Sequence, residues 1–272
     1  MISVTLFSLA LLLARSANAA TQLDLEAIQA HFTQALIVPA LIPTFDPTAV
    51  LSAAFSGAEA STGQHMDQKA VGPKPVVTVS SVQDSSLSGN FTIAMVDADV
   101  VGTDYGADGV NRHWLENGVT ISDGSVSDTS ANVITAYAGP GPASGSGPHR
   151  YVILLYAQPS TFSAPADLSA PVDGVHKFDL NAYVKDSGLG ALVAANYFTV
   201  EVGTDSTSLP VTSAVITSTL ASAQSSAGPS GSHSGSASAS APAPSNPPNN
   251  AVAAKIEMTV AILAAGLSLA LL

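Results

Sequence analysis

The sequence contains no cysteine, few cations and little charge of either sign. Without cysteine the chain has no disulfide, no thiol nucleophile and no Cys-ligated zinc or iron–sulfur site. Lys and Arg together number 8 against 20 Asp and Glu, which gives a formal net charge of −12. Because nucleic acid needs a basic footprint on the protein, we expect no nucleic-acid partner. The 272 residues are nevertheless 46% hydrophobic, which is enough for one substantial folded core.

The first residues have the composition of a secretion signal. Residues 2–14 are almost entirely apolar or small, and Ala17, Asn18 and Ala19 form a small-x-small cleavage sequence. This apolar run is shorter than the roughly 20 residues that a membrane-spanning helix needs. We predict a signal peptide over residues 1–19, with cleavage after Ala19 or the next residue, and hence a secreted protein.

The other end of the chain has the layout of a GPI-attachment signal. Residues 258–272 are apolar, and a run of small residues and a short spacer precede them. A single-pass helix would need a longer apolar segment and flanking cations. We predict that residues 251–272 are a propeptide and that Asn249 is the attachment residue, with Asn250 and Ser245 as alternatives. The anchor would hold the protein at the cell surface, on the plasma membrane or cell wall.

A low-complexity stretch separates the body of the chain from this tail. Residues 221–250 include ten Ser, seven Ala and five Pro and carry no charge. Such a composition buries too little apolar surface to offset chain entropy. We therefore predict one folded domain over residues 20–205 and a disordered Ser/Ala/Pro-rich stalk over residues 206–250, of the kind that is commonly O-glycosylated.

The body has the pattern of a mainly β domain with a few helices. Apolar residues at helical spacing, with acidic residues in the first turn, predict a helix over residues 23–36. Short, partly β-branched runs predict strands over residues 75–80, 91–97 and 151–156, and the last two are apolar on both faces, as buried central strands are. Apolar residues at helical spacing also predict a helix over residues 184–198.

One N-glycosylation sequon is present, Asn90-Phe91-Thr92. In a secreted protein it makes Asn90 an acceptor for glycosylation. The alternatives are a chance tripeptide and a strand start that is too buried to be modified.

Two aspartates close the second predicted strand. If that strand stays extended, the two-residue spacing puts Asp97 and Asp99 on one face, together with Ile93 and Met95. Carboxylates on a core-directed face need a partner or a solvent-filled pocket. Two solvated turn aspartates are the alternative.

A loop rich in Gly and Pro, residues 138–148, leads directly into the third predicted strand. Glycine allows close backbone approach to a ligand, and proline prevents the loop from collapsing. The loop delivers His149 and Tyr151 onto the buried strand, whereas Arg150 is expected to pair with a carboxylate of residues 97–108. Ser146 is followed by a strand rather than a helix, so it lacks the elbow of a serine nucleophile.

These blocks resemble the phosphatidylethanolamine-binding protein family over roughly residues 75–202. The resemblance rests on Asp97-Ala98-Asp99, His113-Trp114-Leu115, and the block that runs from Tyr137 through Gly139-Pro140 to Gly147-Pro148-His149-Arg150-Tyr151. It implies a large antiparallel β fold with a small anion-binding pocket. By the same resemblance, the pocket is lined by Asp97, His113, Gly139, Pro140, His149 and Tyr151. The family has prolines where this chain has Ala98 and Val101 or Gly102.

The residues also agree with the binding of a phosphoryl head group. Imidazoles and loop N–H groups can donate to phosphate oxygens, and Asp97 can keep an imidazole protonated or accept from an ammonium group. We expect a non-catalytic, extracellular binding domain for a phospholipid head group or another small phosphorylated anion, with no cofactor and no metal.

Three other functions remain open from the sequence. Some members of the family inhibit serine carboxypeptidases, so a protease is an alternative partner. A metal-dependent hydrolase would use Asp97, Asp99, His113 and His149, although no H-x-x-x-H pair is present. The domain would be only a spacer if the chain were a structural wall protein.

Overall fold

The computed structural model describes residues 19–82, 87–99, 109–204 and 215–226. The predicted propeptide, Asn249 and almost all of the predicted signal peptide lie outside these residues, as do Val101 and Gly102. Within the described ranges, no helix is both long enough and apolar enough to cross a membrane.

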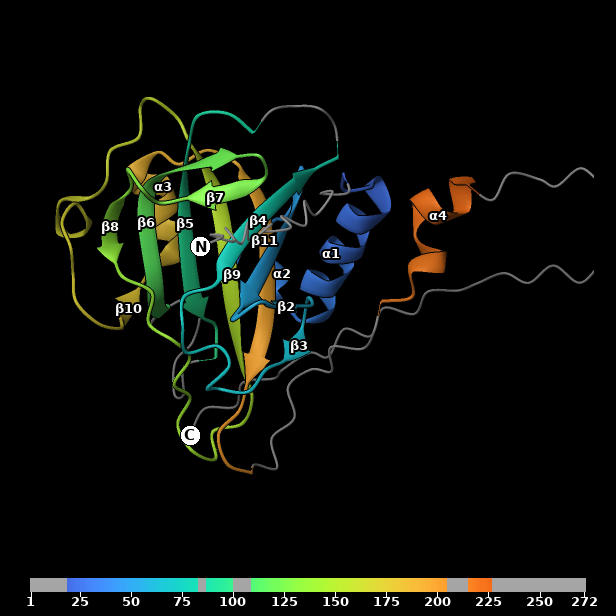
Figure 1. Cartoon of the computed structure of the whole chain (residues 1–272), viewed down its shortest axis with the longest axis horizontal. Coiled ribbons are helices and arrows are strands. Elements are labelled where there is room, and N and C mark those ends of the chain that lie inside the picture. Colours follow the sequence, from blue (N-terminus) through green and yellow to red (C-terminus); the bar gives the residue numbers. More distant parts are fainter. Residues whose placement is uncertain (1–18, 83–86, 100–108, 205–214, 227–272) are drawn as a thin grey trace, which may run out of the picture. The chain divides into compact units, whose positions relative to one another are not determined.

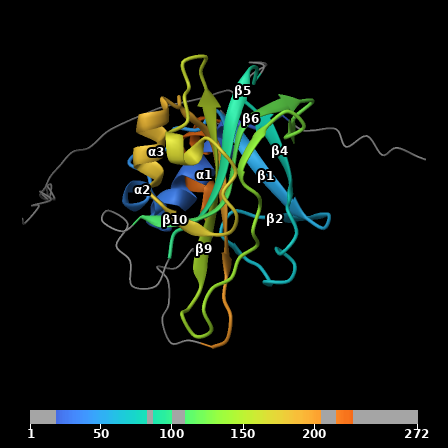
Figure 2. The ribbon, with the colours of Figure 1, turned by 90° about the vertical axis from the view of Figure 1, so that its left-hand side faces the viewer.

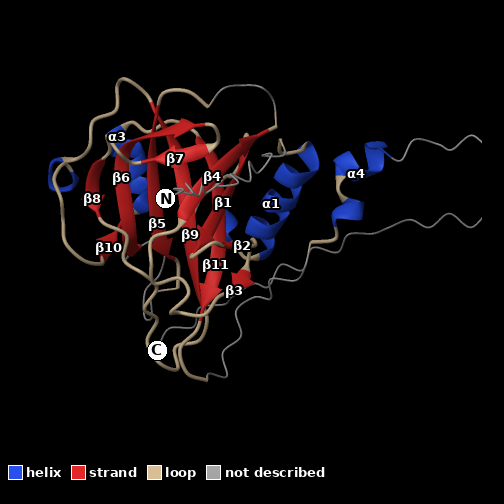
Figure 3. Ribbon diagram, viewed as in Figure 1, coloured by secondary structure: helices blue, strands red, loops and turns tan. Residues whose placement is uncertain are grey.

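Eleven strands and four α-helices are found in the described residues (Figure 1). The strands are β1 (Ala49–Phe55), β2 (Ala58–Ala60), β3 (Gln64–His65), β4 (Val76–Ser81), β5 (Asn90–Asp97), β6 (Val110–Ser122), β7 (Ser125–Ser127), β8 (Asn132–Thr135), β9 (His149–Gln158), β10 (His176–Phe178) and β11 (Leu192–Val200). The helices are α1 (Gln22–Gln34), α2 (Ile37–Ala40), α3 (Leu180–Ser187) and α4 (Ala221–Ser226), with 3-10 turns η1 (Ala166–Leu168) and η2 (Thr217–Thr219). The predicted mainly β class is confirmed (Figure 3).

The strands follow the order β2-β1-β4-β7-β6-β5-β9-β11-β3, and β8 and β10 also pair with β6. Every pair is antiparallel except β11 with β3. The 13-residue strand β6 pairs with β5 from Asn111 to Val119 and with β7 from Thr120 to Ser122, so it connects β5 to β7 in the sheet.

Both faces of the central strands are covered (Figure 2). One face, here the helix face, carries Val96, Val152 and Leu154 and packs against α1 and α3. The opposite face, here the strand face, carries Met95 and Ile153 and packs against β1 and β4. Burial on both faces explains why β5 and β9 are apolar at successive positions.

The helix predicted over residues 184–198 is wrong beyond Ser187. Gly188, with φ of 69°, ends α3, and β11 begins at Leu192. A positive φ favours glycine, which has no Cβ to clash with the backbone. Strand β11 is buried on both faces, so its apolar residues show no period of two and resemble a helical pattern.

Within the predicted stalk, the described residues 215–226 include η2 and α4. The Glu26 carboxylate of α1 accepts hydrogen bonds from the backbone N and the Oγ of Ser222, at 3.0 and 2.5 Å. These bonds lower the pKa of Glu26. The Glu26 carboxylate thus accepts from an N–H group in the first turn of α4 that has no partner inside the helix. The low-complexity sequence by itself does not indicate this contact.

Candidate functional site

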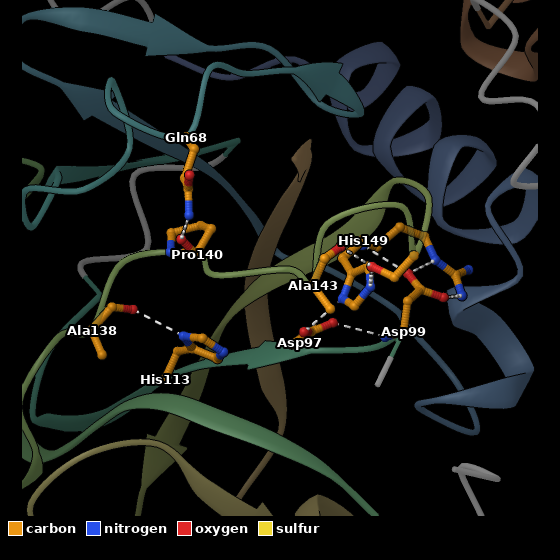
Figure 4. Close-up of polar contacts among 10 residues, drawn as sticks. Gln68, Asp97, Asp99, His113, Ala138, Pro140, Ala143 and His149 are labelled. Atoms are coloured by element: carbon orange, nitrogen blue, oxygen red, sulfur yellow. Dashed lines mark hydrogen bonds and ion pairs between the residues drawn. The ribbon is translucent and has the colours of Figure 1, made fainter. Parts of the chain in front are cut away.

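An aspartate and a histidine form a buried pair where β5 ends and β9 begins (Figure 4). His149 Nδ1 donates to Asp97 Oδ2 at 2.9 Å, and both side chains are only 5% exposed. Burial lowers the pKa of His149, but the hydrogen bond and charge of Asp97, with help from Asp99, outweigh burial and raise the pKa above 6.5. The pair thus favours an imidazolium beside a carboxylate.

A serine of the Gly/Pro-rich loop supports the same protonation state. Ser146 Oγ lies 2.8 Å from His149 Nε2 and donates its only proton to the Ala143 carbonyl oxygen at 2.7 Å. Since the hydroxyl proton is used, Nε2 must be the donor toward Ser146. This arrangement favours a proton on each ring nitrogen of His149, a role for Ser146 that the sequence does not indicate.

A β-bulge determines where His113 points. Met95 of β5 pairs with Trp114 of β6, whereas the next residue, Val96, pairs with Arg112, so His113 is an extra residue in β6. The bulge turns His113 to the strand face, where its ring meets the Tyr151 ring edge-on at 5.2 Å between centroids. His113 and His149 thus reach the same face from different strands.

His113 keeps one ring nitrogen free. Its Nδ1 donates to the Ala138 carbonyl oxygen at 3.0 Å, and no described residue bonds its Nε2. Burial lowers the pKa of His113, so the neutral ring is favoured. In Figure 4 this ring points toward the Asp97–His149 pair. A neutral His113 presents an acceptor there, and a protonated one presents a donor.

Tyr151 completes the predicted set on the strand face. The side chain is fully buried, and its hydroxyl makes no hydrogen bond of ordinary geometry with the described residues. Burial raises the pKa of this hydroxyl, and the charge of nearby Asp97 raises it further. The group therefore stays protonated and is an unused donor.

The two loop residues of the predicted set have partners within the protein. A Cβ on Gly139 would lie 2.8 Å from the Gly72 Cα, so the glycine is required for close packing of two backbone segments. The Pro140 carbonyl oxygen accepts from Gln68 Nε2 at 3.1 Å. Figure 4 shows the Gln68–Pro140 contact, which holds this part of the loop on the His113 side of the Asp97–His149 pair.

Asp99 does not share the face of Asp97, because the condition for that prediction, a strand that stays extended beyond Asp97, is not met. Strand β5 ends at Asp97, and the chain beyond it turns so that Asp99 accepts from Arg150 Nε at 2.8 Å and Nη2 at 2.6 Å. Arg150 also donates to the Ala35 carbonyl oxygen after α1, on the helix face. The predicted pairing of Arg150 with a carboxylate of residues 97–108 is confirmed.

This divergence separates the four residues that a metal-dependent hydrolase would need. Asp99 is bound to Arg150 on the helix face, and both nitrogens of His149 are engaged. Among the described residues, no group of three or more His, Asp or Glu side chains is arranged to hold a metal ion.

Asn90, the predicted glycosylation site, begins β5, and its side chain is exposed. Thr92 of the sequon is buried and donates to Asn117 Oδ1 at 2.9 Å.

The sequence profile described as phosphatidylethanolamine-binding protein matches residues 42–198. The chain belongs to the phosphatidylethanolamine-binding protein family. Asp97, His113, Gly139, Pro140, His149 and Tyr151 all lie inside the matched region.

The chain is similar to three curated proteins. CEN-like protein 1 of Nicotiana tabacum is 27% identical over 168 residues, which cover 61% of this chain and 89% of that protein. The carboxypeptidase Y inhibitor of Saccharomyces cerevisiae is 42% identical over 81 residues, but these cover only 26% of this chain and 34% of the inhibitor. The 26 kDa secreted antigen of Toxocara canis is 26% identical, with 61% and 62% covered.

A solved structure of a carboxypeptidase Y inhibitor is similar to this chain along almost all of the inhibitor's length. The crystal structure of carboxypeptidase Y inhibitor complexed with the cognate proteinase is similar at a TM-score of 0.54 and 26% identity. The comparison covers 65% of this chain and 96% of the inhibitor chain.

Proposed function

We propose that the chain is a non-catalytic, extracellular binding domain for small phosphorylated or anionic head groups. The observation that carries the proposal is the set of unused polar groups beside a buried ion pair on the strand face. These groups are the Tyr151 hydroxyl and His113 Nε2, next to Asp97 and His149.

The charge of the set favours an anion once His113 binds a proton. The Asp97 carboxylate and the His149 imidazolium cancel, so the set is neutral while His113 is neutral. An anion that accepts from Tyr151 also favours protonation of His113, which turns Nε2 into a donor and gives the set one positive charge. Binding is therefore expected to take up a proton.

The same geometry supports a binding role over acyl-transfer chemistry. Ser146, His149 and Asp97 are connected in the order of a serine-hydrolase triad, but the serine proton points to the Ala143 carbonyl oxygen. A general base needs a free lone pair on the imidazole, and His149 carries protons on both nitrogens.

The extracellular part of the proposal rests on the sequence of the two chain ends. The secretion signal over residues 1–19 and the attachment signal around Asn249 would present the domain at the cell surface. Release by a GPI-specific phospholipase, or covalent recovery in a wall fraction, is the expected result. A freely soluble form that still carries Leu272 would contradict it.

Calorimetric titration with phosphoethanolamine and with inorganic phosphate tests the binding role. The expected result is saturable one-site binding that weakens by at least about tenfold in His149→Ala, because the Asp97 carboxylate loses its positive partner and then repels the anion. His65→Ala removes an exposed imidazole of β3 and is the matched control. If neither anion binds, or if folded His149→Ala binds as well as the unchanged protein, the proposal fails.

A second function, inhibition of a serine carboxypeptidase, is favoured by the likeness to the inhibitor in its proteinase complex. Purified protein is expected to inhibit a carboxypeptidase Y-type enzyme in a stoichiometric manner. His149→Ala separates the two roles, because inhibition through surface loops would survive the loss of anion binding. Full carboxypeptidase activity in the presence of excess protein would exclude this second function.

A further inference from the structure

A cavity on the helix face of the sheet is lined by a buried arginine. It has a volume of about 360 Å³ and lies between α3, β10, β6 and the segment around η1. Figure 2 shows α3 and β10 next to each other on this side of the sheet. Arg112 of β6 lines the cavity together with Phe178, Tyr183 and Leu168.

Arg112 lacks the partners that a buried guanidinium needs. The residue is 2% exposed, and Nε donates to Thr135 Oγ1 at 2.7 Å. Its Cζ lies 5.2 Å from the centre of the Phe178 ring. Among the described residues, neither Nη atom has a hydrogen-bond partner, and no carboxylate forms an ion pair with Arg112. Burial lowers the pKa of the guanidinium, and the electrostatic contributions of Tyr183 and Asp167 only partly oppose this effect.

The other buried arginine of the sheet shows what is missing. Arg150 is 5% exposed and lies on the same helix face, but the Asp99 carboxylate binds its Nε and Nη2, and the Ala35 carbonyl oxygen binds its Nη1. A buried charge without such compensation is costly. The two Nη atoms of Arg112 face the cavity instead of a protein carboxylate. A carboxylate that binds both Nη atoms at once matches the planar geometry of the guanidinium.

The rim of the cavity selects among anions. Its charged residues besides Arg112 are Lys177 and three aspartates, Asp167, Asp179 and Asp186, so acids outnumber cations by one when His176 is neutral. Asp179 already caps α3 by accepting from Ala182 N at 2.9 Å. A dianion would meet net repulsion at this rim. A monoanion that carries its own ammonium group would find Arg112 below it and acidic groups at the edge.

We propose that this cavity is a second ligand site, which binds the carboxylate of a small zwitterion of the α-amino acid class. The carboxylate pairs with the Arg112 Nη atoms, the ammonium faces Asp167 and Asp186, and an apolar side chain lies against Leu168 and Val172. The site is separate from the proposed head-group site, because Arg112 and His113 are neighbours in β6 that point to opposite faces of the sheet.

Titration of the purified protein with L-leucine, N-acetyl-leucine, leucinamide and inorganic phosphate tests this site. L-leucine is expected to bind saturably at one site, N-acetyl-leucine at least several-fold more weakly, and leucinamide not at all. An excess of phosphate should leave the leucine isotherm unchanged. If leucine does not bind, or if leucinamide binds equally well, the proposal is overturned.

Two sets of variants assign the binding to these residues. Arg112→Gln is expected to weaken leucine binding by at least tenfold, whereas Lys185→Gln, an exposed cation of α3 outside the cavity, should not change it. Because Arg112 is buried, Arg112→Gln could fail to fold. The double variant Asp167→Asn/Asp186→Asn changes only exposed residues of the rim and therefore tests the site without disturbing the core. The rim variant should weaken leucine several-fold without weakening N-acetyl-leucine, and Glu59→Gln is its exposed acidic control. Unchanged leucine affinity in the folded rim variant would contradict the proposal.

Discussion

His149 Nε2 lies 2.8 Å from Ser146 Oγ, and the imidazole is the donor of this hydrogen bond. In a serine hydrolase the serine hydroxyl donates to the imidazole instead. The serine proton is given to the Ala143 carbonyl oxygen, so the imidazole donates to the serine. With Asp97 on the other ring nitrogen, His149 is held as a cation in the interior of the domain. This direction of proton donation leaves the imidazole without the free lone pair that would activate a serine nucleophile.

Anion binding is predicted to strengthen as the pH falls. Burial lowers the pKa of His113 in the free protein, and a bound anion would raise it, so binding takes up a proton. Between about pH 8 and about pH 5.5, the association constant for sulfate should rise by at most about tenfold per pH unit. Sulfate is the suitable probe because its own charge is constant in this range.

Calorimetry at several pH values, in buffers of different ionisation enthalpy, measures both the affinity and the proton uptake. His113→Asn should bind sulfate more weakly and without the pH dependence. Affinity that is flat with pH in the unchanged protein would show that His113 does not take part.

The stability that the Asp97–His149 pair contributes is predicted to fall as the pH rises, because the pair raises the pKa of His149. The folded-state pKa of His149 lies above its ordinary value of 6.5, so the pair's contribution is complete below that value and is lost as the pH rises through the folded pKa. Each unit of difference corresponds to about 1.4 kcal/mol. The free energy of unfolding of His149→Gln should therefore approach that of the unchanged protein at alkaline pH.

Urea denaturation from about pH 5 to about pH 9, where carboxylates stay ionised, measures this difference. His65→Gln, at an exposed position of β3, is the control and should show a difference that is constant with pH. A gap between His149→Gln and the unchanged protein that widens with rising pH would contradict the assigned imidazolium.

The sequence predicts the strands of the site better than the direction of its side chains. The Gly/Pro-rich loop followed by an apolar run correctly places His149 at the start of a buried strand, and a polar residue after an apolar run correctly places Asp97 at the end of another. Both inferences need only local composition. They therefore survive even though strand β9, at His149–Gln158, is longer than the predicted run.

The orientation of His113 could not be predicted from the sequence. Strict alternation along β6 would put His113 and Trp114 on opposite faces, but the bulge opposite Met95 and Val96 places both on the strand face. A bulge depends on how two strands pair, and one strand's sequence does not state its partner. The same limit applies to Asp99, whose position depends on the chain turning after Asp97.

Ser146 is predicted to help hold His149 protonated. In Ser146→Ala the Nε2–H loses its acceptor, so the charged imidazole is less stabilised and the pKa of His149 should fall. An NMR titration of the His149 ring protons measures the change. Ser144→Ala, an exposed serine of the same loop, is the matched control and should leave the titration unchanged.

The opposite result would reverse the assigned hydrogen bond. If the pKa of His149 rises in Ser146→Ala, the serine donates to a neutral imidazole in the unchanged protein. An ester-hydrolysis assay on both proteins then becomes decisive, since a nucleophilic Ser146 would show turnover that the alanine variant lacks.

Removal of the Asp99 carboxylate is predicted to lower the free energy of unfolding far more than removal of a carboxylate in an exposed ion pair. Asp99→Asn leaves the Arg150 guanidinium, whose side chain is 6% exposed, without its anionic partner. Loss of one member of a buried ion pair costs about 3–5 kcal/mol. The matched control is Asp128→Asn, because the Asp128 side chain is 52% exposed and pairs with Lys74, and such surface pairs contribute about 0–1 kcal/mol.

Urea denaturation of the two variants at one pH compares these free energies of unfolding. In the double variant Asp99→Asn/Arg150→Met the unpaired charge is gone, so part of the lost stability should return. If Asp99→Asn and Asp128→Asn cost the same, the guanidinium has found other partners or solvent. In that case the carboxylate that follows β5 does not stabilise the contact between Arg150 and the Ala35 carbonyl oxygen at the end of α1.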